Sequence, residues 1–211
     1  MRWLLLILLL AAPGRAGAAA PPPFADALPW ERLAGAHPGD WAEYVVHVGG
    51  HPVGPWLRLL VVGPGAGGTW VEIWISQRPG SATQAYRLLL GDRGGVRRVV
   101  ARLLGGQSRE MPPPAAAPTR KSSAPTEWTR RGEEVVQTEA GSLRAEATES
   151  WSGGERIACA WFAPEVPVLG LVRLDLAGGS GLELHRWGRG GNGVVEVPDP
   201  PPPREAHADR R

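Results

Sequence analysis

The sequence predicts a mainly β protein, folded as one large curved antiparallel sheet or open half-barrel with at most one or two short helices. Apolar runs of strand length alternate with polar residues at period two, and glycine-rich turns separate them. Almost no stretch shows helical periodicity. Strands of eight residues are about 27 Å long at roughly 3.4 Å per residue, which fits a large sheet better than a small sandwich.

The first three strands are expected at 41–48, 55–62 and 69–76, where the turn-rich segments GGHPVG and GPGAGG divide an antiparallel meander. Ser152-Gly153-Gly154-Glu155 predicts a tight hairpin turn. Residues 29–35 predict a short helix, because proline suits a first helical position and glycine suits the stop. Further strands are expected at 84–90, 96–104, 133–139, 142–151, 156–162, 168–176, 181–187 and 193–197.

The N-terminus has the pattern of a secretory signal peptide over residues 1–18. Arg2 precedes an apolar run from Trp3 to Ala12, and the small residues before Ala18 predict cleavage after that residue. The run is shorter than the about 20 apolar residues that a membrane-spanning helix needs. We therefore expect a bacterial protein that is periplasmic or secreted, soluble after cleavage, and without an integral membrane span in the mature chain.

The rest of the chain predicts one domain over residues 19–197. Two segments lack the large apolar residues that would offset their ordering entropy. Residues 111–126 (MPPPAAAPTRKSSAPT) predict a flexible loop, and residues 198–211 predict a disordered, proline-rich tail.

Charge and cysteine content exclude two classes of interaction. The full chain has 23 basic and 21 acidic residues, and loss of Arg2 and Arg15 with the signal leaves 21 of each. A neutral mature chain argues against a nucleic-acid partner. Cys159 is the one cysteine, so no internal disulfide can form, and its position between Ile157 and Trp161 on one strand face predicts a small buried hydrophobe.

Alternation along the first three strands places tryptophans and charged residues on the same face. Trp70, Glu72 and Trp74 share one face of their strand, Trp41 and Glu43 share a face of theirs, and Trp56 and Arg58 lie on one face of the strand between. We predict that Arg58 lies opposite Glu72 and Trp56 opposite Trp74, because that register pairs opposite charges and aromatic rings.

Nine tryptophans follow the signal, and tryptophan combines a large apolar body with one hydrogen-bond donor. The functional hypothesis is that a concave sheet face holds a lipid or other apolar ligand. Packing of the same rings in an ordinary core is the alternative. The candidate ligand-binding residues are Trp41, Trp56, Arg58, Trp70, Glu72, Trp74, Trp151 and Trp161.

The sequence offers no catalytic, metal-binding or cofactor-binding constellation, and we expect a protein that is not an enzyme. No Gly-x-Ser-x-Gly elbow occurs, and the glycine run at 63–69 lacks the lysine of a phosphate-binding loop. His37, His47 and His51 have no matching cysteine or carboxylate cluster that would predict a metal site.

The run from Trp161 to Val172 (WFAPEVPVLGLV), within residues 133–187, carries a family resemblance. It resembles uncharacterised exported bacterial β-proteins allied to the LolA-like superfamily of outer-membrane lipoprotein sorting, in which a strand ending in tryptophan meets a Val-Pro-x-x-Gly corner. The resemblance implies a curved half-barrel with an apolar concave face that carries acyl chains. The same run is also explained as a structural corner, because Pro164 and Pro167 interrupt ladder pairing and Gly170 permits a bend.

Two function classes follow. The first is a non-enzymatic periplasmic binding or carrier protein whose curved sheet holds a lipid or other apolar small molecule. The alternative is a non-catalytic structural or interaction module of the cell envelope, whose proline-rich segments engage another envelope protein in extended conformations.

Overall fold

The computed structural model describes residues 28–33, 35–79, 83–92, 94–103, 107–111 and 127–195. Within them it confirms the mainly β fold, with one 11-stranded antiparallel sheet and a short 3₁₀ helix. The elements are η1 (Trp30–Leu33), β1 (Trp41–Val48), β2 (His51–Gly65), β3 (Gly68–Ser76), β4 (Gln84–Leu90), β5 (Val96–Leu103), β6 (Arg109–Met111), β7 (Glu127–Thr138), β8 (Gly141–Ser152), β9 (Glu155–Phe162), β10 (Leu171–Leu176) and β11 (Ser180–Gly188).

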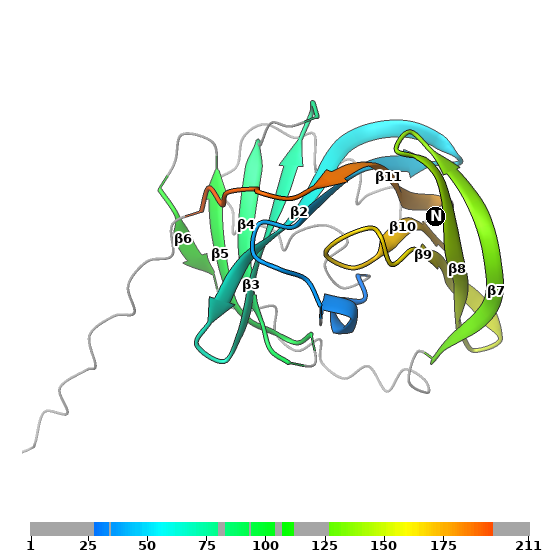
Figure 1. Ribbon diagram of the computed structural model, residues 1–211, viewed down its shortest axis with the longest axis horizontal. Coiled ribbons are helices and arrows are strands. Elements are labelled where there is room, and N and C mark those ends of the chain that lie inside the picture. The colour runs from blue at the N-terminus through cyan, green and yellow to red at the C-terminus, as the bar shows by residue number, and fades with distance from the viewer. Residues whose placement is uncertain are drawn as a thin grey trace, which may run out of the picture.

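The strands follow the order β6-β5-β4-β3-β2-β1-β11-β10-β9-β8-β7, so the two ends of the meander meet where β1 pairs with β11. Figure 1 shows that the sheet curls into an open half-barrel, with η1 and the connection between β9 and β10 inside the curve. Seven of the strand pairs contain a register shift or bulge. Bulges bend strands and increase their twist, which accounts for the curvature.

The predicted hairpin turns are confirmed where glycine supplies positive φ at both central positions. Gly153 and Gly154, at φ 59° and 82°, connect β8 to β9. Gly49 and Gly50, at 61° and 79°, connect β1 to β2 in the same way, but β2 begins at His51 rather than at 55, so the expected turn segment 49–54 is reduced to two residues. Both turns have the backbone twist that suits a two-residue hairpin loop.

The predicted register between β2 and β3 is wrong by two residues. Arg58 lies opposite Trp74, and Glu72 lies opposite Leu60. The reason is that β2 continues through Gly63 and Pro64 to Gly65, and a bulge between Val61 and Gly63 takes up the extra length. A shift of two keeps each side chain on its own face, so the prediction of which residues share a face survives.

Other differences lie at strand ends. The short strand β6 was not predicted, β7 begins before the expected residue 133, and β10 begins at Leu171 rather than at 168. Residues 193–195 form no strand, contrary to expectation. The expected helix over 29–35 is a single 3₁₀ turn. The signal peptide with its cleavage after Ala18, residues 112–126 of the expected loop and the tail 198–211 lie outside the described residues.

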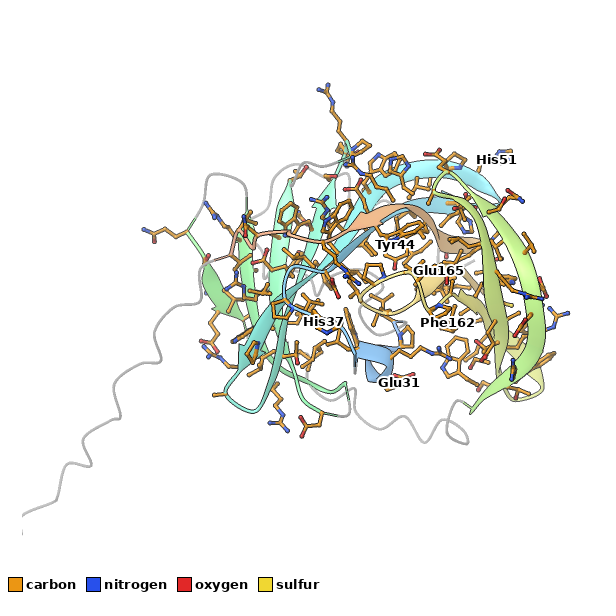
Figure 2. All side chains as sticks on the ribbon, viewed as in Figure 1. Glu31, His37, Tyr44, His51, Phe162 and Glu165 are labelled. Carbon is orange, nitrogen blue, oxygen red and sulfur yellow. The ribbon has the colours of Figure 1, made fainter. Side chains whose placement is uncertain are left out.

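The main apolar core lies on the concave face of the sheet. Aliphatic side chains that alternate with the tryptophans of β2 and β3 form it, and η1 together with the β9–β10 connection packs onto them. Tyr44 also points into the curve (Figure 2), where its hydroxyl donates a hydrogen bond to the Leu171 carbonyl at 3.1 Å. Burial raises the pKa of Tyr44 far above its usual value. The concave face is therefore a packed core around inserted segments.

Candidate functional site: an inner cleft and a closed outer face

The tryptophan and charged residues predicted as a binding face lie on the outer, convex side of the sheet. In β3, Val71 and Ile73 are fully buried in the main core, whereas Trp70 and Trp74 alternate with them and stay half-buried on the other side. The expectation that these rings line the concave face is therefore corrected. The physical reason is that the all-aliphatic face buries more completely than one that also carries glutamate and arginine.

On this outer face, Arg58 lies between two indole rings and beside a buried carboxylate. Its guanidinium is 4.0 Å from the ring centroid of Trp41 and 5.2 Å from that of Trp74. Its Nε lies 3.6 Å from Oε2 of Glu43, whose Oε1 accepts a hydrogen bond from Arg186 at 2.9 Å. Burial lowers the pKa of Arg58, Glu43 opposes that shift, and Arg186 adds to it. This is a compact ion-pair and cation–π cluster.

Glu72 is the centre of a second cluster on the outer face. It is fully buried, and its carboxylate accepts hydrogen bonds from Trp74 Nε1 at 2.7 Å and from the guanidinium of Arg87. The backbone N–H groups of Val194 and Val195 donate to the same carboxylate at 2.8 and 2.9 Å. Such a saturated carboxylate serves as an anchor for the chain that bonds to it.

The chain that Glu72 anchors is residues 189–195, which we call the C-terminal strap. It leaves β11 and crosses the outer face toward β5 (Figure 1), where the Val194 carbonyl accepts a hydrogen bond from Arg102. Val195 is buried beside Ala85, Val100 and the ring of Trp74. Gly193 fits because a Cβ there would lie 2.5 Å from Arg87 Nη2 and 2.7 Å from Glu72 Oε1.

The remaining predicted site residues do not join these clusters into one site. Trp56 packs edge to face on His185, with ring centroids 4.4 Å apart. Trp151 is 46% exposed at the β8–β9 hairpin. Trp161 donates from Nε1 to Glu134 at 3.2 Å, with the Arg173 guanidinium 5.6 Å from its ring. The eight residues are therefore spread over strands β1, β2, β3, β8 and β9.

The histidines considered as metal ligands are also dispersed. His47 is buried at the end of β1, its Nε2 3.2 Å from Asp175 Oδ1, and it lines a small pocket of about 360 Å³ beside the glycine turns. His37 pairs with Asp40, and His51 is exposed. In the described ranges no three His, Cys, Asp or Glu side chains converge on a metal position. Cys159 lines the same pocket and is 3% exposed, as predicted, and burial raises its pKa.

A larger space lies on the concave side and was not predicted. We call it the inner cleft. It has a volume of about 770 Å³ and opens between the segment after η1, the β7–β8 hairpin and the β9–β10 connection. Its apolar lining comprises Ala36, Ala145, Phe162, Ala163, Val166, Val168 and Leu169, and its charged or polar lining comprises Arg32, His37, Asp40, Glu133, Arg144, Glu146, Glu165 and Arg189.

The charged residues that line the inner cleft are largely paired with each other. Arg189 Nε lies 3.5 Å from Asp40, and Arg144 Nε lies 3.2 Å from Glu133. The Arg32 guanidinium stacks 3.7 Å from the ring centroid of Phe162. Paired charged side chains and apolar side chains together give the cleft an amphipathic lining.

The β9–β10 connection, residues 163–170, holds an unusual backbone conformation at the inner cleft. Val168 has φ 73°, in the left-handed region that a β-branched residue rarely adopts, and its side chain is 3% exposed. Hydrogen bonds from Ala163 N to Gly170 O at 2.7 Å and from Val166 N to Ala163 O at 3.2 Å close the loop. Figure 2 shows Phe162 and Glu165 within the curve of the sheet.

This loop coincides with the run that the sequence analysis interpreted as a corner. The prolines do end the strand, as expected, since β9 stops at Phe162 and β10 begins at Leu171. Nothing in the sequence showed that the loop turns inward. One available signal was its apolar content, because Val166, Val168 and Leu169 form a cluster too hydrophobic for a solvated connection.

Comparison with known proteins gives a fold and no family. No protein-family model matches the chain, and no curated protein sequence matches it. The hypothetical protein CT021 from Chlamydia trachomatis matches with a TM-score of 0.53 and 12% identity, over 82% of this chain and 98% of that one. This likeness shows a shared fold.

Two other solved structures are more distant. A predicted exported protein with a YmcC-like fold from Bacteroides fragilis matches with a TM-score of 0.39 and 12% identity, over 73% of this chain and 97% of that one. A DUF1329 family protein from Desulfovibrio piger matches with a TM-score of 0.33 and 12% identity, over 72% and 70%. In the described part of the chain, no helix combines the length and apolar character needed to cross a bilayer.

Proposed function

We propose that this chain is a non-enzymatic, exported binding or carrier protein that holds the apolar part of a lipid or similar amphiphile in the inner cleft. The observation that carries the proposal is the inner cleft itself. Its volume of about 770 Å³ is within the usual range of roughly 300–1,000 Å³ for small-molecule sites. Apolar side chains and paired charged side chains both line it, which suits a molecule with an apolar and a polar part.

The strained loop 163–170 supports the same assignment. A β-branched residue in the left-handed region costs about 1–3 kcal/mol and persists only when its surroundings hold it. Val168 bears that cost while its side chain fills part of the concave space. Because strained backbone conformations cluster at ligand sites, a strained loop in the wall of the cleft supports a binding role for it.

Obstruction of the inner cleft tests the proposal. Gly35 lines the cleft, and a Cβ built on it meets no atom within 4 Å. We expect Gly35→Phe to add a ring at the cleft, because the first side-chain carbon there meets no neighbour. Gly95 is equally open and lies outside the cleft, so Gly95→Phe is the matched control.

The measurement is a fluorescence titration with dansylated undecanoic acid. We expect saturable binding to the wild type and to Gly95→Phe, and affinity at least tenfold lower for Gly35→Phe, which corresponds to about 1.4 kcal/mol. Equal affinity of both variants for the probe would place binding elsewhere. Absence of saturable binding to the wild type would reject an apolar ligand.

A further inference from the structure

The open sheet ends on one side in a long strand with a free edge. β7 has 12 residues and pairs with β8 along one side, and no described strand lies on the other side. The opposite end of the sheet is β6, with three residues. A free edge of this length presents a row of backbone donors and acceptors to which another strand can pair.

The middle of β7 has its charges in two blocks of opposite sign. Arg130 and Arg131 precede Gly132, and Glu133 and Glu134 follow it. Next to the acidic block, Val135 is 66% exposed, which is unusual for an aliphatic side chain here, since few large hydrophobic residues of the described chain are so exposed. A strand with charges of only one sign would repel a second copy of itself. Two blocks of opposite sign can instead pair with a strand that carries the same blocks in the reverse order.

The complement is the same strand in the antiparallel orientation. If two copies of β7 pair with Gly132 opposite Gly132, Arg131 of each copy lies opposite Glu133 of the other, and Arg130 lies opposite Glu134. Opposite charges then meet at all four charged pairs, and Thr129 lies opposite Val135. Directly opposed charges of opposite sign stabilise a strand pair, and like charges destabilise it.

We propose that β7 is a homodimerisation edge, at which two copies of this chain pair antiparallel about Gly132 and join their sheets into one. The two-fold axis passes through glycine, where the absence of side chains allows the two backbones to approach. The same patch serves on both copies, as a closed two-fold interface requires.

The ion pairs that these residues make within one chain do not prevent the exchange. Arg130 Nη2 lies 3.7 Å from Glu133, with side chains 63% and 52% exposed, and Arg144 Nε lies 3.2 Å from Glu133. Exposed pairs of this kind contribute about 0–1 kcal/mol, so their replacement by pairs between copies costs little. The bulge at Arg131 leaves that residue without a partner on β8, and its guanidinium reaches Glu149 at 3.3 Å.

The dimer is expected to be reversible. One pair of strands buries less than the about 1,200 Å² of a standard stable interface, so dilution and high salt should both dissociate it. The proposed dimer is independent of the inner cleft, because the residues of β7 can pair between copies without a ligand.

Charge reversal of each half of β7 tests the proposal by sedimentation velocity over a concentration series. The first variant is Arg130→Glu with Arg131→Glu, and the second is Glu133→Arg with Glu134→Arg. Each alone places like charges opposite each other at all four pairs. We expect self-association at least tenfold weaker than that of the wild type for each variant, and recovery of the dimer when the two variants are mixed in equal amounts.

Recovery in the mixture is the decisive result, because loss of the within-chain pairs cannot produce it. Glu31→Arg with Glu155→Arg is the control, since it changes net charge as much as the second variant does at exposed positions outside β7. This control should dimerise as the wild type does. A wild type that stays monomeric at all concentrations, or two folded variants that do not associate when mixed, would overturn the proposal. Wild-type affinity in both separate variants would place the dimer interface elsewhere and also overturn it.

Discussion

The two faces of the β1–β3 region bury different kinds of side chain. On the outer face, the carboxylates of Glu43 and Glu72 are buried but meet arginines, an indole N–H and backbone donors. On the inner face, aliphatic side chains pack around an inserted loop whose Val168 is strained, and a cleft of about 770 Å³ remains beside it.

This difference distinguishes buried polar groups that hold the fold together from a site that has room for a ligand. A buried carboxylate that is saturated by its own chain has no capacity left for a ligand, and it holds the C-terminal strap instead. The inner cleft, in contrast, is unfilled, and both apolar and charged side chains line it. We therefore expect the outer clusters to stabilise the fold, and the proposed binding site is the inner cleft, although the outer face contains more tryptophans and buried charges.

The largest expected effect comes from Glu72. In Glu72→Gln, the amide NH₂ faces donors that the carboxylate satisfied, and Arg87 loses its buried counter-charge. We expect a loss of about 3–5 kcal/mol in the free energy of unfolding, the usual result of breaking a buried pair. Urea denaturation measures it. A loss below about 1 kcal/mol would show that the outer cluster is not the anchor of the strap.

On the inner face, the backbone strain at Val168 can be tested by comparison with a neighbouring valine. Val166 and Val168 lie in one loop and are 2% and 3% exposed, but only Val168 has a positive φ. Val166→Gly should lower the free energy of unfolding by the full contribution of a buried valine. In Val168→Gly the same loss is partly offset, because glycine adopts a positive φ without strain. We expect Val168→Gly to be the more stable variant by about 1–3 kcal/mol in urea denaturation. Equal stability of the two variants would contradict the claim that the backbone at Val168 is strained.

The smallest expected effect concerns the exposed ion pair between Arg98 and Glu110. Glu110 accepts two hydrogen bonds from Arg98, and this bonding lowers the pKa of Glu110. A lowered pKa in the folded state means that the stabilisation is present above the ordinary range of the carboxyl, near pH 4, and is lost as pH falls through the lowered value.

Glu110→Gln should therefore cost no more than about 1 kcal/mol at neutral pH, because its side chain is 41% exposed, and nothing at strongly acidic pH. Urea denaturation at neutral pH and near pH 2.5 checks both values. A loss at neutral pH as large as that of Glu72→Gln would contradict the distinction between buried and exposed carboxylates.

The sequence was sufficient for the fold class, since period-two alternation and glycine turns are local signals that the sheet preserves. It was insufficient for register, because the bulge after Val61 adds a residue to β2 that no local pattern announces. It was also insufficient for the direction of curvature. Alternation separates two faces of a strand but does not say which face a distant segment will cover.

That ambiguity explains the outcome for the candidate site. Trp74 was expected on the concave face, but Val194 and Val195 pack against its ring from the outer side, although they lie more than 100 residues away in sequence. The inner cleft depends on the inward turn of loop 163–170, which is likewise a long-range arrangement. Sequence patterns identified this loop as a corner and left its function open.

Native mass spectrometry of protein purified gently from its expression host tests the central claim most directly. The account predicts an excess mass on the wild type and on Gly95→Phe, which extraction after denaturation identifies as a lipid or similar amphiphile, and a loss of that mass in Gly35→Phe. Retention of the same bound molecule in folded Gly35→Phe would contradict the claim that the inner cleft holds the ligand.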